Sequence, residues 1–77
     1  MVNEFTIESR TTEVIKVRHV AHGHRFTFRV FEQPSGLRIL RGGPIQANER
    51  ASLPPELFRK GARSSAEREA RKADLID

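Results

Sequence analysis

Alternating apolar and polar positions dominate the first half of this chain. In the runs "EVIKVRHVA" and "RFTFRVFE", β-branched or aromatic residues recur at every second position, which is the period of a half-buried β-strand. The tripeptide "HGH" separates the two runs, and Gly23 suits a tight turn. The pattern therefore predicts an antiparallel hairpin over residues 14–32, with Val17, Phe28 and Val30 buried on one side.

The register of this hairpin stays open between two possibilities. A turn at His22-Gly23 pairs Val17 with Phe28, whereas a turn at Gly23-His24 pairs Val17 with Val30. Both registers give the same two faces, because they differ by an even number of residues. One face holds Ile15, Val17, His19, Ala21, Phe26, Phe28 and Val30. The other holds Lys16, Arg18, Val20, Arg25, Thr27, Arg29 and Phe31.

A third strand is predicted in "LRILR", after a turn in "QPSG". If residues 33–36 form the loop, Val30 lies opposite Ile39 on the apolar face. Arg38 then joins Phe31 on the other face, and Arg41 lies at the end of the apolar side. The strand is expected to stop at "GGP".

A further strand is predicted in "EFTIE", where Phe5 and Ile7 share one parity. If Ile7 lies opposite Ile15, Glu4 falls beside Arg18 as an ordinary cross-strand ion pair. The pairing stays open because "SRTT" contains no strong turn residue.

The second half of the chain reads as a connector followed by helix. Gly-Gly-Pro and Pro-Pro punctuate the connector, and Pro55 suits a first helical turn. Gly61 predicts a pause, and Ser64, three positions before Glu67, has the spacing of a capping box that restarts the helix. Four alanines follow Phe58 at helical spacing and predict a helix laid across the apolar face of the sheet: Ala62, Ala66, Ala70 and Ala73.

Strands first and a helix afterwards predict an α+β fold, a three- to four-stranded antiparallel β-meander with a C-terminal α-helix packed on one face. Seventy-seven residues make one domain. We expect sheet over residues 1–43, connector over 44–54 and helix over 55–76.

The segments "RFTFRVFEQPSG" and "AEREARKADLID" carry a resemblance to small uncharacterised bacterial proteins that consist of a β-meander and one helix. The resemblance implies the fold and a bacterial origin, but no activity. The order of elements also resembles the second half of a double-stranded-RNA-binding domain. The chain departs from that family because no first helix precedes the sheet and the last helix begins "ARSSAER" rather than with lysines.

The positive charge of the chain is concentrated in the strands. The net charge is +4, yet the charges of residues 61–77 balance, whereas residues 14–41 carry six basic residues and one carboxylate. Such asymmetry favours an anionic partner, and a solvated basic face is the plain structural alternative. The candidate anion- or nucleic-acid-binding residues are Lys16, Arg18, Arg25, Arg29, Phe31 and Arg38.

Other chemistries find little support in the sequence. The absence of cysteine excludes disulfides, thiolate metal sites and thiol nucleophiles. His19 is expected at the core edge, with His22 and His24 exposed at the turn, so the three do not converge on a metal. The serines have no neighbouring base, and no enzyme activity and no cofactor are expected.

Two classes of function remain. One is a nucleic-acid or other polyanion-binding module that uses the basic sheet face, with Phe31 as a stacking surface. The other is a protein-interaction module, a homodimer or a partner-bound chain, in which Val14, Val20, Phe31 and Leu40 make that face partly apolar. No apolar run reaches membrane-spanning length and "MVNEFTIESR" does not resemble a signal peptide, so we expect a cytoplasmic protein without membrane contact.

Overall fold

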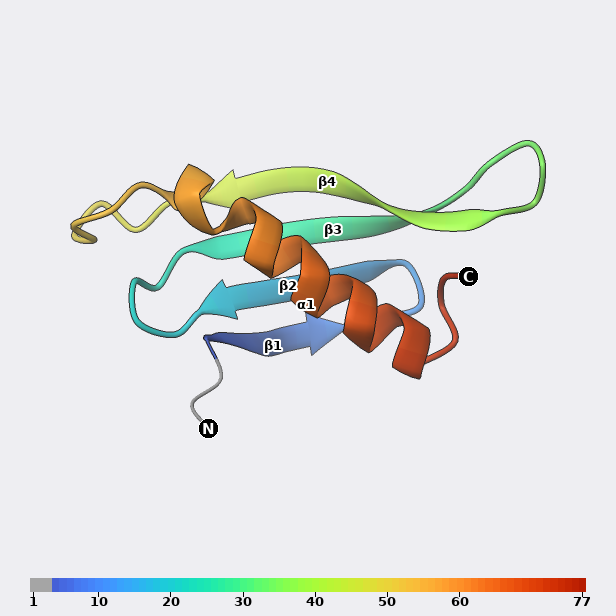
Figure 1. Cartoon of the computed structure of the whole chain (residues 1–77), viewed down its shortest axis with the longest axis horizontal. Coiled ribbons are helices and arrows are strands. Elements are labelled where there is room, and N and C mark those ends of the chain that lie inside the picture. Colours follow the sequence, from blue (N-terminus) through green and yellow to red (C-terminus); the bar gives the residue numbers. More distant parts are fainter. Residues whose placement is uncertain (1–3) are drawn as a thin grey trace.

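The computed structural model describes residues 4–77 and contains one open antiparallel sheet and one long helix (Figure 1). The strand order is β1-β2-β3-β4, and the helix α1 runs diagonally across one face of the sheet. The elements are β1 (Phe5–Arg10), β2 (Val14–His19), β3 (Arg25–Glu32), β4 (Arg38–Gln46), the 3₁₀-helix η1 (Pro55–Phe58) and α1 (Arg59–Lys72). The predicted α+β meander with a C-terminal helix is confirmed.

The core lies between the sheet and α1. The predicted inner positions Val17 and Phe28 are buried, whereas Val30 is only partly buried and Ala21 is exposed in the loop after β2. Three of the four predicted helix alanines have no exposed surface, which lets α1 lie close to the strands. The core comprises Ile15, Val17, Phe26, Phe28, Leu40, Ala62, Ala66, Ala70 and Ile76.

The β2–β3 hairpin has a four-residue loop, so both predicted registers are wrong. The amide of His19 donates to the carbonyl of His24 (2.8 Å), and the Gly23 amide donates to the His19 carbonyl (2.8 Å). Val17 therefore lies opposite Phe26. The loop is longer than predicted by an even number of residues, and for that reason the predicted faces survive.

The β3–β4 hairpin has an odd loop instead, which reverses the predicted faces of β4. Pro34, Ser35 and Gly36 form a three-residue loop closed between Gln33 and Leu37, with Gly36 in the left-handed region (φ 91°). A type I turn followed by a left-handed glycine is a common hairpin connection. One loop residue fewer than predicted moves every β4 side chain to the opposite face.

The pairs observed between β3 and β4 document this reversal. Leu40 rather than Ile39 lies opposite Val30, and Leu40 is buried beneath α1. Arg38 lies opposite Glu32 on the helix side, and Arg41 lies opposite Arg29 on the other side. The predicted positions of Ile39, Arg38 and Arg41 are therefore wrong.

Strand β4 continues three residues beyond the predicted end of the sheet at residue 43, as far as Gln46. A bulge sets Gly43 and Pro44 opposite Thr27, between the Phe26–Ile45 and Phe28–Gly42 pairs. Pro44, which lacks an amide donor, is tolerated because β4 is an edge strand.

Strand β1 pairs with β2 through Ile7 and Val17, and not through the predicted Ile15. The register shifts between Ile7 and Ser9, which marks a bulge at Glu8. Thr6, and not Glu4, lies opposite Arg18, so the predicted Glu4–Arg18 pair does not form.

Helix α1 passes through Gly61 without interruption, so the predicted pause and the restart at Ser64 are wrong. Gly61 instead packs against Phe5 of β1, where a Cβ would lie 2.7 Å from Cε2 of the ring. The helix ends at Lys72, before Asp74 (φ 60°), and not at residue 76. Ile76, in the short tail after the helix, then returns to the core.

Candidate polyanion-binding face

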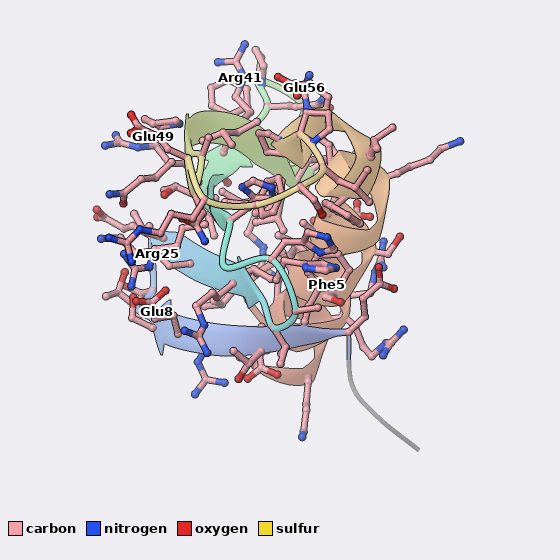
Figure 2. The ribbon with its side chains drawn as sticks, turned by 90° about the vertical axis from the view of Figure 1, so that its left-hand side faces the viewer. Phe5, Glu8, Arg25, Arg41, Glu49 and Glu56 are labelled. Carbon is pink, nitrogen blue, oxygen red and sulfur yellow. The ribbon has the colours of Figure 1, made fainter. Side chains whose placement is uncertain are left out.

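The face of the sheet opposite α1 is not covered by any element of the described chain, and we call it the outer face. Figure 2, an end view, shows Glu8 and Arg25 on this side and the helix on the other. By strand alternation, five of the six predicted site residues lie on the outer face: Lys16, Arg18, Arg25, Arg29 and Phe31.

Arg38, the sixth predicted residue, is engaged on the helix side. Its Nη2 lies 3.3 Å from Oδ1 of Asp77, and its Nη1 donates to the carbonyl of Asp74 (3.0 Å). The Arg38 amide also donates to Oδ2 of Asp77 (2.8 Å). This backbone hydrogen bond, with the guanidinium contact second, lowers the pKa of the Asp77 carboxyl. Arg38 therefore anchors the C-terminal tail and does not belong to the candidate site.

Two pairs of arginines lie directly opposite each other on the outer face. Arg18 is the cross-strand partner of Arg25, and Arg29 is the cross-strand partner of Arg41. Like charges at directly opposed positions destabilise a sheet. Lys16 lies between the two pairs, opposite Thr27.

Carboxylates neutralise little of this charge. Nε of Arg25 donates to Oε2 of Glu8 (3.1 Å). Within residues 4–77, no ion pair joins Arg18, Arg29 or Arg41 to a carboxylate. Lys16 forms no such ion pair either. Of the five cations on the outer face, all except Arg25 thus remain free to attract an anion.

Arg41 is the residue of the outer face that the sequence prediction misplaced. Its guanidinium carbon lies 4.3 Å from the centroid of the Phe31 ring, a cation–π contact. The signal that places it is "PSG", which marks a three-residue loop and so gives Arg41 the same parity as Arg29. Phe31 is consequently covered on one side and presents a guanidinium plane rather than a bare ring.

A shallow depression lies at the end of the outer face where the β2–β3 loop meets the connector. It has a volume of about 440 Å³, and its lining includes Arg18, Arg25 and Arg50. Gly23, Gln46, Ala47, Asn48 and Glu49 complete the lining. Figure 2 shows Arg25 and Glu49 on the same side of the sheet. Arg50 was not predicted as a site residue, since no periodicity in the connector relates it to the strands.

The three histidines form a cluster on the opposite side, which corrects the prediction that His22 and His24 are exposed. His24 is 1% exposed and His22 is partly buried. The Phe58 ring stacks on His19 and His22, with centroids 4.0 and 4.9 Å apart. The four-residue loop explains this placement, because it sets His24 opposite His19 on the helix side.

The hydrogen bonds of these rings are structural. Nε2 of His24 donates to the Leu53 carbonyl (2.7 Å), and its Nδ1 accepts the Asn48 amide (3.0 Å). Nδ1 of His19 accepts the His22 amide (3.1 Å), and its Nε2 lies 3.3 Å from Oε1 of Glu4. Over the described residues, no group of three or more histidine, cysteine or acidic side chains could hold a metal ion.

Comparisons with known proteins add no relative. No protein-family model, curated protein or solved structure matches the chain. The resemblance to small bacterial meander proteins therefore stays a prediction. None of the helices in residues 4–77 has the length and apolar character needed to cross a membrane.

Proposed function

We propose that this chain is a non-enzymatic module that binds a polyanion, in the first place a nucleic acid, through the outer face of its sheet. The observation that carries the proposal is the presence of two directly opposed arginine pairs, Arg18–Arg25 and Arg29–Arg41, on a sheet face without a covering layer. A bound chain of phosphates offsets the repulsion within both pairs at once.

The dimensions of the face favour a polymer over a single small anion. Arg25 and Arg29 are four residues apart on β3, which corresponds to about 13 Å at about 3.3 Å per residue. One phosphate contacts both arginine pairs only if their side chains lean toward each other along the strand. A polymer with regularly spaced charges reaches both, and Lys16 lies between them.

The chemistry of the face supports recognition of the backbone rather than of the sequence. Arginine and lysine neutralise phosphates, whereas reading of single-stranded bases usually requires two or three aromatic rings. Phe31 is the single aromatic residue on the outer face of the described strands, and Arg41 already lies against it. We therefore expect weak sequence preference and strong dependence on salt.

The experiment compares two double variants of equal charge. Arg29→Gln with Arg41→Gln removes one opposed pair, and Arg68→Gln with Arg71→Gln removes two exposed helix charges as the matched control. A plot of log affinity for single-stranded DNA against log salt has a negative slope. In the sheet variant the magnitude of this slope should decrease by about 1.4, at about 0.7 per lost phosphate contact. The control should leave the slope nearly unchanged.

Two results would contradict the proposal. An equal loss in both variants would show that net charge alone governs retention. Absence of binding to single-stranded DNA and to heparin at low salt would favour the alternative, a protein-interaction module. The exposed apolar side chains Leu53 (43%) and Leu57 (63%) would then be the first residues to test, since the predicted contribution of Leu40 is excluded by its burial.

A further inference from the structure

The depression beside the β2–β3 loop lies at one end of the basic outer face. The two strands of the central hairpin and the connector each bring one arginine to it: β2 contributes Arg18, β3 contributes Arg25 and the connector contributes Arg50. We infer that this depression binds one backbone phosphate of a single-stranded nucleic acid, with Arg50 as the third cationic ligand. The inference rests on the proposed function and assigns its most specific contact.

The connector holds Arg50 in place through Asn48. The side-chain Nδ2 of Asn48 donates to the His22 carbonyl (2.8 Å), and the backbone amide of Asn48 donates to Nδ1 of the buried His24 (3.0 Å). Oδ1 of Asn48 accepts the Arg50 amide (3.2 Å), which closes a local turn. The backbone at Arg50 is therefore tied to the hairpin that carries the other two arginines.

The charges within the depression favour a phosphate ligand. Arg18 and Arg50 form no ion pair with a carboxylate in residues 4–77, and Arg25 uses its Nε on Glu8. Glu49 also lines the depression and opposes an anion there. With Glu8 on Arg25 and Glu49 in the lining, three guanidinium groups against two carboxylates leave one net positive charge, and guanidinium forks match the geometry of phosphate oxygens.

The position of the depression also indicates how a strand runs. It lies at the Arg25 end of β3, and the Arg29–Arg41 pair lies about 13 Å further along the same strand. A bound nucleic-acid chain therefore runs along β3, with one phosphate in the depression, the following phosphates near Lys16 and a later phosphate at Arg29 and Arg41.

The test uses two probes on the full chain. Thymidine 5′-monophosphate and an oligothymidylate of about eight nucleotides, a length typical of small single-strand-binding domains, are titrated into ¹⁵N-labelled protein at low salt. The mononucleotide should shift the amide signals of Gly23, Asn48 and Arg50 and leave those of Arg29 and Arg41 in place. The oligonucleotide should shift both groups.

Variants then assign the contact. Arg50→Gln should weaken both probes about tenfold, as expected for loss of a charge-assisted hydrogen bond. Arg41→Gln, which removes the same charge at the other end, should weaken the oligonucleotide alone. An unchanged amide spectrum outside the connector verifies that the Arg50 variant is folded, and Arg68→Gln is the control for net charge.

The outcomes separate this inference from the proposed function. If the oligonucleotide binds the outer face while the mononucleotide shifts no signal of the depression, or if Arg50→Gln behaves like Arg68→Gln, the phosphate site is wrong and the polyanion-binding face stands. If neither probe binds, both are wrong. If the mononucleotide binds the depression and the oligonucleotide adds no contact along β3, the site serves a free nucleotide, and the assignment to a nucleic-acid backbone is overturned.

Discussion

Leu40 and Ile39 are neighbours on β4 that distinguish the observed register from the one that the sequence pattern predicted. Leu40 is 1% exposed and belongs to the core, whereas Ile39 lies opposite Phe31 on the outer face. Replacing a fully buried leucine by alanine costs about 2–5 kcal/mol, and the cost is greatest where neighbours cannot close the cavity. The small side chains that α1 places on the core, Ala62 and Ala66 among them, have little freedom to do so.

We therefore expect Leu40→Ala to lower the free energy of unfolding by about 3 kcal/mol. Ile39→Ala should lower it by about 1 kcal/mol, the typical value for a point substitution outside the core. The hydrogen bond from Nη2 of Arg63 to the Leu40 carbonyl (2.8 Å) involves the backbone and neither of the substituted side chains. The comparison thus measures side-chain burial alone.

Urea denaturation followed by circular dichroism measures both variants against the parent chain. A domain of this size has a free energy of unfolding of about 4–12 kcal/mol, so the loss expected for Leu40→Ala is a large fraction of it. In thermal unfolding, each kcal/mol corresponds to about 4–8 °C in Tm. A larger loss from Ile39→Ala than from Leu40→Ala would refute the three-residue loop and restore the register with Ile39 inside.

Three further predictions follow from single contacts. Phe28→Ala, at a position 3% exposed, should cost about 3 kcal/mol in urea denaturation, and a loss below about 0.5 kcal/mol would contradict its place in the core. The pKa of Asp77 is lowered, chiefly by the Arg38 amide, so its contribution is present above the ordinary aspartate pKa and is lost as the pH falls through the lower folded value. Asp77→Asn should therefore destabilise the chain at neutral pH but not in strong acid, and a difference from the parent that is constant with pH would contradict this. Gly23→Ala should cost about 1–2 kcal/mol in thermal unfolding, because φ is +73° and the new Cβ would lie 3.0 Å from Nδ2 of Asn48; an unchanged Tm would show that the loop relaxes freely.

The sequence by itself determined the strands, the inner face of the central hairpin and the alanine stripe of the helix. These features depend on local periodicity, which a single segment carries without its neighbours. The predicted face of Val17 and Phe28 is correct although the register is wrong. The real loop exceeds the predicted one by two residues, and an even shift keeps each side chain on the same face of the sheet. For the same reason, Lys16, Arg18, Arg25 and Arg29 were placed correctly on the outer face.

The structure decided the remaining placements: that of Arg41 depends on the length of the local "PSG" loop, whereas those of Arg38, Gly61 and Arg50 depend on contacts between distant segments. A loop shorter by one residue exchanged Arg38 for Arg41 on the outer face, and Arg38 instead binds Asp77 at the end of the chain. Gly61 reads as a helix breaker in the sequence, yet the ring of Phe5 occupies the space that a side chain would need. Arg50 reaches the depression through hydrogen bonds between Asn48 and the His22–His24 loop, and no pattern within the connector encodes the contact of two segments that lie more than twenty residues apart.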